Sequence, residues 1–354
     1  MTTIEMDKLR TFPNLSAAAF QHPLDVQAVA GISQVPLLAT FLTKISGSLW
    51  ERQMWLSQIS STLRLGPNQG QSLYKKFVQA ATILDIPELP EIYVSNQYTI
   101  NAYAFGIERY QITLYSGLID SLSEAELMAV IGHELGHVKC QHMLYKTMAF
   151  IIRLLGMNSL NNFLPAGTGL LASLSLQLAI LQWERMAELS CDRASLLVVQ
   201  DPKIVASALT KLAGGSRGLA DEITLEGVLQ QAQEYHDAGD NLLEKILKVN
   251  MMLFQTHPFP VVRVKEITEW AESAQYQQIM QGDYAQTGVT QSTAMNEPTG
   301  LVCPNCEEVN PSSRATCLAC GETLSKSRLV CTQCGLKVFD TWQRCPGCGS
   351  ELRH

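Results

Sequence analysis

Two histidines and a glutamate form the pattern with the clearest chemistry in this sequence. His133 and His137 stand four residues apart in VIGHELGHV, and Glu134 directly follows the first histidine. On a helix, positions i and i+4 lie on the same face, so both imidazoles can reach one zinc ion. Glu134 is offset by one residue and can take a proton from a zinc-activated water. The pattern therefore predicts a zinc site with its own general base. The alternative is a pair of solvent-facing helix histidines.

A catalytic zinc usually takes three protein ligands and keeps one position open. His142 follows His137 by five residues, which turns it to another face of the helix, so we look for a carboxylate from another helix. The segment WERMAELSCDRASLL offers Glu188, with Asp192 four residues later on the same face. Glu188 can bind the zinc while Asp192 holds the outer nitrogen of a zinc histidine. The spacing equally allows both carboxylates to form surface ion pairs with neighbouring arginines.

Cysteines are concentrated after residue 300, where four C-x-x-C pairs form two similar blocks. These cysteines are Cys303, Cys306, Cys317, Cys320, Cys331, Cys334, Cys345 and Cys348. Each C-x-x-C turn presents two thiolates to one ion, so four turns suit two tetrahedral zinc sites of four cysteines each. A secreted disulfide framework would instead spread its cysteines through the chain. The two remaining thiols, Cys140 and Cys191, are expected to be small buried core residues.

The elements that must position these groups are predicted to be mostly helical around a small sheet. Residues 1–85 carry apolar residues at helical spacing. ELPEIYV, TINAYAFG and QITLYSG are short runs rich in β-branched and aromatic residues, which predict two or three strands. Ser123 and Glu126 form a capping-box pattern that begins the helix bearing the two histidines. Further helices are predicted from Asp201 to Gly214, twice over about 222–255, and over about 260–275.

The segment from 147 to 183 is apolar, with Arg153 as its only charged residue. Its run AGTGLLASLSLQLAILQW is at the lower length limit for a membrane-spanning helix. Pro165 and two glycines interrupt the segment, and serines and glutamines dilute it. We therefore expect buried or interfacial helices, and membrane insertion is the alternative.

Charge and composition indicate which binding partners and which cellular compartments to expect. The net charge of −7 is spread without long runs, so nucleic acid is not an expected partner. The opening residues MTTIEMDKLRTFPNLS lack a basic stretch followed by an apolar one, so we expect a cytoplasmic protein, or one associated with a membrane. Residues 282–300 are polar, small and aperiodic, which predicts a flexible linker between domains at 1–281 and 301–354.

Several spaced motifs occur in one order: HPLDVQAV, NAYAFG, LYSGLIDSLSEAELMAVIGHELGHVKCQH, WERMAELSCDRASLL, KLAGG and THPFPVVRV. In this combination the chain resembles the HtpX-like zinc metallopeptidases, which are relatives of the CAAX prenyl protease. The resemblance implies a zincin-like catalytic domain that hydrolyses peptide bonds. It also implies zinc ligands at His133, His137 and Glu188 and a base at Glu134. The cysteine blocks resemble a double zinc ribbon.

The resemblance marks three further residues. Asp192 matches the carboxylate that stands four residues after the ligand glutamate. His257 in THPFP, six residues before Arg263, matches a histidine that steadies the oxyanion of the tetrahedral intermediate; a capping or buried histidine is the alternative. Asn101 in NAYAFG matches an edge strand to which an extended substrate adds, and an ordinary turn residue is the alternative. Many relatives have two clear membrane helices before the ligand glutamate, whereas the corresponding segment here is broken.

Together these patterns predict an α+β, mostly helical fold: a zincin-like metallopeptidase domain with a small β-sheet, followed by a small double zinc-ribbon domain whose metal sites each have four cysteines. We expect a zinc metalloendopeptidase with one catalytic and two structural zinc ions. Its expected partners are protein or peptide substrates, a protein recruited by the ribbons, and a membrane surface in peripheral contact. Two alternatives stay open: a non-catalytic zinc-ribbon adaptor on a zincin scaffold, and a membrane-embedded protease of the same chemistry.

Overall fold

The computed structural model describes most of the chain before residue 288 and four short segments after it. The described residues are 8–33, 49–106, 109–155, 170–214, 219, 222–238, 259–287, 300–302, 309–311, 329–330 and 337–338. The chain divides into two compact units, Met1–Ala285 and Gln286–His354. The Tyr284 hydroxyl donates to the Pro13 carbonyl at 3.1 Å, so the first unit extends past residue 281. The flexible linker over 282–300 stays a prediction from composition.

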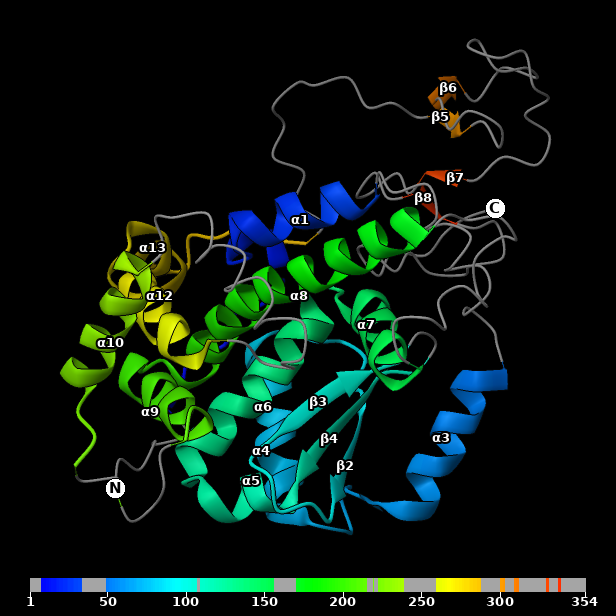
Figure 1. Cartoon of the computed structure of the whole chain (residues 1–354). Coiled ribbons are helices and arrows are strands. Elements are labelled where there is room, and N and C mark those ends of the chain that lie inside the picture. Colours follow the sequence, from blue (N-terminus) through cyan, green and yellow to red (C-terminus); the bar gives the residue numbers. More distant parts are fainter. Residues whose placement is uncertain are drawn as a thin grey trace. The chain divides into compact units, whose positions relative to one another are not determined.

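The first unit is mostly helical with one small sheet, as the sequence predicts (Figure 1). Its described helices are a 3₁₀ helix at Ala17–Ala19 and α1 Pro23–Ser33, α3 Leu49–Ser61, α4 Gln71–Ile83, α5 Ser116–Ser121, α6 Glu124–Lys139, α7 Met143–Leu155, α8 Leu170–Val199, α9 Pro202–Leu212, α10 Leu225–Asp237, α12 Pro260–Glu272 and α13 Ala274–Gln281. Its strands are β1 Leu63–Arg64, β2 Glu91–Ser95, β3 Ala102–Phe105 and β4 Gln111–Tyr115. In the second unit, β5 Gly300–Val302 pairs with β6 Val309–Pro311, and β7 Leu329–Val330 pairs with β8 Lys337–Val338.

The sheet of the first unit has the strand order β1-β2-β4-β3, which places β3 at one edge. β2 runs parallel to β4, and β3 runs antiparallel to β4 with Ala102 opposite Leu114. Buried Ile92 and Ile112 join this sheet to the apolar core. The three predicted strands are confirmed as β2, β3 and β4. β1 is an addition, because a two-residue strand is too short to show the alternation that identifies strands in a sequence.

α6 begins at a capping box and is buried along nearly its whole length. The Ser123 side chain accepts from the Glu126 N–H, and the Glu126 carboxylate accepts from the Ser123 N–H at 2.7 Å, so the predicted helix start is confirmed. Every residue from Ala125 to Val138 is buried. α6 packs against α4, α8, α9 and β3. Polar side chains inside such a helix must find partners in the protein, because water does not reach them.

Two glycines let α8 approach α6 closely. A Cβ atom placed at Gly136 would stand 2.8 Å from the Ala194 Cβ and 3.0 Å from the Cys191 Cα of α8. One turn earlier, a Cβ atom at Gly132 would stand 2.8 Å from the Val198 Cβ. These distances are shorter than ordinary contacts, so any side chain here would force the helices apart. The glycine spacing thus fixes the distance across which residues of α8 face the histidines of α6, and Figure 1 shows the two helices lying together.

Alanine at Gly136 is therefore expected to destabilise the first unit. Overpacking of a close helix contact lowers the free energy of unfolding by about 1–3 kcal/mol. Gly31 in α1 is the matched control, because a Cβ atom there meets nothing within 4 Å among the described residues. Gly31→Ala should raise the free energy of unfolding by up to about 1 kcal/mol through helix propensity alone. Thermal unfolding of both variants checks this, and a shift of the same sign in both would contradict it.

α6 ends in a turn that the sequence did not reveal. Gln141 adopts the left-handed conformation with φ 60°, the His142 N–H donates to the His137 carbonyl at 2.8 Å, and the Gln141 N–H donates to the Val138 carbonyl at 3.1 Å. These two bonds form a Schellman motif, which usually has glycine at the left-handed position. The chain therefore reverses after Cys140 and brings His142 back toward His137. Our expectation that His142 turns to another face is wrong, because it assumed that the helix continues.

α7 and α8 occupy the described parts of the apolar segment 147–183, and residues 156–169 between them lie outside the described residues. Of the helices that the structure describes, none combines the length and apolar character needed to cross a membrane. The second half of α8 instead carries the buried acidic residues Glu184, Glu188 and Asp192. α7 and α8 pack against each other, and the prediction of buried or interfacial helices over the whole segment stays a prediction.

Helices α9, α10 and α12 follow α8 in the chain, and α12 packs against α8. α9 begins as predicted, since Asp201 accepts from the Lys203 N–H at 2.9 Å and Pro202 opens the helix. α10 accounts for the first of two helices predicted over 222–255, and the second falls in 239–258, outside the described residues. α12 packs against α8, α9 and α10 and carries Arg263 toward the centre of the unit.

Candidate metal centre

Two imidazoles from α6 meet one carboxylate from α8. The Nε2 atoms of His133 and His137 each lie 3.3 Å from an oxygen of Glu188. The His133 side chain is 8% exposed, and the other two side chains are fully buried. The one-turn spacing on α6 aligns the imidazoles, and the close approach at Gly136 brings Glu188 within reach. The structure thus brings together the three residues that the sequence predicts as zinc ligands.

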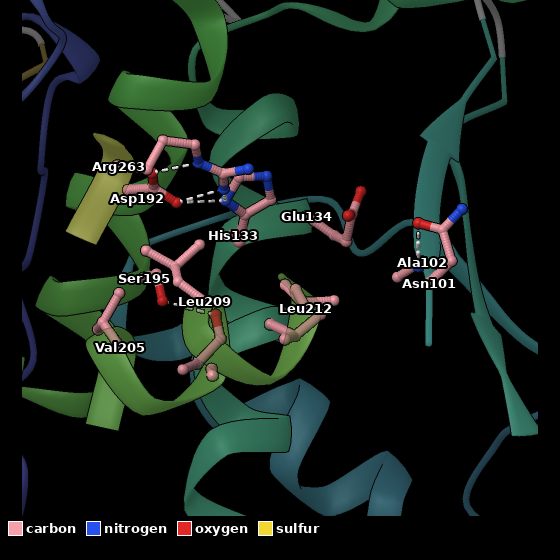
Figure 2. A pocket seen from close by; sticks show the side chains of 13 residues that line it. Asn101, Ala102, His133, Glu134, Asp192, Ser195, Val205, Leu209, Leu212 and Arg263 are labelled. Atoms are coloured by element: carbon pink, nitrogen blue, oxygen red, sulfur yellow. Dashed lines mark hydrogen bonds and ion pairs between the residues drawn. The ribbon is translucent and has the colours of Figure 1, made fainter. Parts of the chain in front are cut away.

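Asp192 and Arg263 lie on the outer side of His133. Asp192 Oδ1 is 3.0 Å from His133 Nδ1, and Arg263 donates to the same carboxylate from Nε at 2.7 Å and from Nη2 at 2.6 Å. Arg263 Nη1 lies 3.0 Å from Glu188 Oε2. Figure 2 shows the guanidinium, the Asp192 carboxylate and the His133 ring joined by these contacts. Because Glu188 and Asp192 are both buried, the surface ion pairs that their spacing also allowed are not formed.

The surrounding charges act differently on the groups of this centre. Burial alone would raise the pKa of Asp192, but the charge and hydrogen bonds of Arg263 outweigh it and lower that pKa. Burial alone would lower the pKa of His133, but the Glu188 and Asp192 carboxylates raise it to about 9. Burial and the nearby Lys146 ammonium together lower the pKa of His137 well below its ordinary value. His133 thus contacts two carboxylates and Arg263, whereas His137 lies beside the Glu188 carboxylate and the Lys146 ammonium.

Lys146 of α7 is a buried cation beside the same centre. Its Nζ atom lies 3.0 Å from His137 Nε2 and 3.8 Å from Glu188 Oε1. An ammonium group only donates hydrogen bonds, so His137 Nε2 is the acceptor. The protein itself therefore places a positive charge next to His137 Nε2 and the Glu188 carboxylate.

The donor set fits a zinc ion. In a tetrahedral site with bonds of about 2.0–2.1 Å, neighbouring ligand atoms lie about 3.3–3.4 Å apart. The two nitrogen-to-oxygen distances of 3.3 Å at this centre agree with that spacing. Two imidazoles and one carboxylate also leave a fourth position open, which is typical of catalytic zinc.

Cys191 is a further thiol at the edge of this centre. Its sulfur and one nitrogen from each of His133 and His137 lie within 4.8 Å of one another. Burial raises the pKa of the Cys191 thiol well above its ordinary value, which disfavours the thiolate that zinc binds. Both Cys191 and Cys140 are buried, in agreement with the small core residues that we expected.

A pocket opens beside Glu134, between α6, α9 and the edge strand β3 (Figure 2). Its lining is largely apolar, with Val130, Val205 and Leu209 among the residues that form it. In Figure 2, Glu134 lies between His133 and Asn101, which stands directly before β3. Glu134 is 1% exposed, and its Oε2 atom has no hydrogen-bond partner among the described residues. This carboxylate oxygen therefore remains available to accept a proton from a group entering the pocket.

Asn101 lines this pocket, and its role in substrate binding stays a prediction. Its side-chain oxygen accepts from the Ala102 N–H at 3.0 Å, and its carbonyl accepts from the Tyr115 N–H at 3.1 Å. His257 lies outside the described residues, as do all eight ribbon cysteines. The roles predicted for these nine residues stay predictions.

Sequence reasoning missed several residues that surround the centre. Arg263 was visible only as the arginine six residues after His257, and nothing in that spacing pointed to Asp192. Lys146 carried no motif at all. His142 is not expected near the zinc site from the sequence, because a helix that continued past Cys140 would place it on another face than His137. The strongest available signal is charge, because Lys146 stands at the start of an apolar helical segment, where a buried charge requires a partner.

Comparison with known proteins assigns the two parts of the chain. The model of peptidase family M48 matches residues 67–271, and the double zinc ribbon model matches residues 303–349. A plastoglobule-localized metallopeptidase 48 from the chloroplast of Arabidopsis thaliana is 37% identical over 271 residues, which cover 76% of this chain and 77% of that protein. A protease HtpX homologue from Burkholderia cenocepacia is 26% identical over 250 residues, which cover 65% of this chain and 85% of that protein.

Among solved structures, Ste24p from S. mikatae matches 72% of this chain and 68% of its own with 17% identity and a TM-score of 0.33, a score too low to support a fold comparison. The family match covers more than half of the chain, and the Arabidopsis relative is similar over most of both proteins. The resemblance to HtpX-like metallopeptidases is thereby confirmed. The chain belongs to peptidase family M48 and is a metallopeptidase followed by a double zinc ribbon.

Proposed function

We propose that this metallopeptidase cleaves peptide bonds within protein substrates and that His133, His137 and Glu188 hold its catalytic zinc. The supporting observation is the meeting of two imidazole nitrogens with one buried carboxylate at 3.3 Å, beside the pocket that Glu134 lines. A scaffold without catalysis would need no carboxylate with an unused oxygen there. The adaptor alternative accounts for the ribbons but not for Glu134.

Glu134 acts as the general base and then as the general acid. Zinc, when bound, polarises the substrate carbonyl and lowers the pKa of a water molecule toward neutrality. Glu134 takes the proton of the attacking water and passes it to the leaving amine. Asp192 and Arg263 hold the ring of His133 from its outer side, which keeps its Nε2 atom directed at the centre.

The substrate chain lies along the edge strand β3. Among the strands that the structure describes, β3 pairs with β4 alone, so its outer backbone groups can pair with an extended peptide. Asn101 stands where such a peptide would pass Glu134, and the apolar lining of the pocket suits an aliphatic side chain. His257 is the proposed additional donor to the oxyanion of the tetrahedral intermediate.

The ribbons recruit protein partners or substrates and hold two structural zinc ions, one for each group of four cysteines. The metal supplies most of the folding free energy of so small a domain. Residues 301–354 contain six Lys or Arg and five Asp or Glu, so they offer no basic surface for nucleic acid. A cytoplasmic location and peripheral contact with membranes complete the proposal; the name of the Arabidopsis relative places that protein at the plastoglobule.

Metal removal tests the proposal. Dialysis against a chelator should abolish cleavage of an unfolded protein substrate, and added zinc should restore it. The chain should bind three zinc ions, and His137→Ala should bind two because it keeps both ribbon sites. Cleavage that persists in His137→Ala at the wild-type rate would exclude this centre as the active site. An inactive wild-type chain with three zinc ions would favour the adaptor.

A further inference from the structure

A chain of three buried side chains leads away from the outer face of His137. His137 Nδ1 lies 3.2 Å from His142 Nδ1, and His142 Nε2 lies 2.9 Å from Asp25 Oδ2. All three residues are at most 1% exposed. Asp25 belongs to α1, and 117 residues of sequence separate it from His142. The contact therefore joins the beginning of the unit to the outer nitrogen of a proposed zinc ligand.

Asp25 is held as a carboxylate that accepts from four sides. Its Oδ2 accepts from the Ser190 hydroxyl at 2.6 Å and from the Gln21 amide at 3.0 Å, in addition to His142. Its Oδ1 accepts from the Trp183 indole N–H at 3.1 Å. So many donors fix both the charge of Asp25 and its orientation.

These contacts leave one consistent arrangement of protons. A carboxylate only accepts, so His142 Nε2 carries the proton that faces Asp25. His137 Nδ1 and His142 Nδ1 lie 3.2 Å apart, so one of them donates to the other; with the His142 proton on Nε2, the donor is His137 Nδ1. The lone pair of His137 is thereby placed on Nε2, the atom that faces Glu188. This is the tautomer that zinc requires at that nitrogen.

The contact of Lys146 with the other nitrogen of the His137 ring indicates the same tautomer. Its ammonium lies 3.0 Å from His137 Nε2 and can only donate, so Nε2 is unprotonated. If His142 Nδ1 were the donor instead, the proton of His137 would have to lie on Nε2, the atom that accepts from Lys146. The two ends of the ring thus agree independently.

We propose that Asp25 and His142 form a hydrogen-bonded relay that positions His137 for zinc. The relay holds the proton of His137 on Nδ1 and fixes the orientation of its ring, so that Nε2 is directed at the metal site. Both Asp25 and His142 are positioning residues, because neither reaches the metal or the substrate. The inference rests on the proposed function and deepens it. The two ligand histidines differ in this respect. The outer nitrogen of His133 contacts the Asp192 carboxylate directly, whereas that of His137 is connected to the Asp25 carboxylate through the imidazole of His142. The connection through His142 is possible because the turn at Gln141 brings His142 back to His137.

The test measures zinc affinity in the full chain, at free zinc concentrations set by a chelator. His142→Leu removes both hydrogen bonds of the relay and should weaken the third zinc site about 10–100-fold while leaving both ribbon sites filled. His142→Asn is the conservative variant, because its side-chain oxygen can accept from His137 Nδ1 in place of the imidazole. It should recover most of the lost affinity. Thr147→Val is the matched control, because it removes a buried bond to Gly106 without touching a ligand, and its zinc affinity should equal that of the wild type.

The outcomes separate this inference from the proposed function. A wild-type chain that binds only two zinc ions would overturn both. A third zinc whose affinity is unchanged in His142→Leu would overturn the relay and leave the proposed function intact. An equal loss in His142→Leu and Thr147→Val would also overturn the relay, since general destabilisation would then explain both.

A second measurement keeps the relay testable if the leucine variant does not fold. In metal-free wild-type protein labelled with ¹⁵N-histidine, the ring nitrogens report directly which atom carries the proton. We expect His137 to be protonated on Nδ1 and His142 on Nε2, with His142→Asn identifying the second signal by its disappearance. The opposite assignment for either ring would overturn the relay.

Discussion

Replacing Glu134 with glutamine should lower the rate of peptide hydrolysis by about 10²–10⁴-fold, the usual contribution of a positioned general base. Glutamine keeps the shape of the side chain but cannot accept the proton of the attacking water. Because Glu134 Oε2 has no hydrogen-bond partner among the described residues, the substitution breaks no contact made by that atom. The variant should therefore retain its fold and all three zinc ions. Cleavage of an unfolded protein substrate and zinc content, measured on one preparation, check both parts.

Glu124→Gln is the matched control for that experiment. Glu124 is the first residue of the same helix, and its side chain is 84% exposed and pairs with Lys76 at 3.3 Å. Its loss should change neither activity nor zinc content, because a surface ion pair contributes at most about 1 kcal/mol. If Glu134→Gln kept more than about a tenth of the wild-type rate, another group would have to move the proton and the mechanism would be wrong.

The parts of the centre that the sequence predicted are those fixed by local geometry. The spacing of His133 and His137 places both rings on one face whatever the rest of the fold does, and Ser123 marks the start of their helix. Spacing alone left Glu188 open between a zinc ligand and a surface ion pair, and the family resemblance favoured the ligand. Its burial depends on Gly136, which lies within the H-E-x-x-H motif itself.

The parts that the sequence did not predict depend on one unusual residue and on distant contacts. Gln141 has the left-handed conformation that normally marks glycine, so the reversal after α6 left no trace in the residue types. Asp25 and Arg263 reach the centre from α1 and α12, and no periodic pattern connects such elements. The sequence and the family resemblance therefore predicted the three ligands and Asp192, but not Arg263, His142 and Asp25, which lie around them.

That second layer also concentrates buried charge. Asp192, Glu188, Arg263 and Lys146 are all buried within reach of one another, and each would be costly without its neighbours. Buried charges of this kind add little stability beyond what well-packed apolar residues would give, but removing one partner is strongly unfavourable. The centre therefore makes the stability of the unit depend on complete charge pairing around the two histidines.

Methionine at Arg263 should consequently lower the free energy of unfolding of the first unit by about 3–5 kcal/mol. The change leaves the Asp192 carboxylate buried without the two guanidinium bonds at 2.6 and 2.7 Å and removes the cation 3.0 Å from Glu188. At about 2–4 °C for each kcal/mol, the thermal midpoint should fall by roughly 10 °C. Thermal unfolding followed by intrinsic fluorescence checks this value.

Two further variants show whether lost charge pairing is the cause. Lys265→Met on the same helix removes a cation that is 30% exposed, lies 3.9 Å from Glu269 and donates to the exposed Gln233 side chain at 3.0 Å. Because these contacts are at the surface, the free energy of unfolding should change by less than about 0.5 kcal/mol. Adding Asp192→Asn to Arg263→Met removes the stranded carboxylate and should recover part of the loss, because the penalty belongs to the unpaired charge and not to the missing contact. If the double variant were instead as unstable as the sum of the two single variants, the destabilisation would come from lost packing around Arg263, and the charge pairing around the centre would not govern its stability.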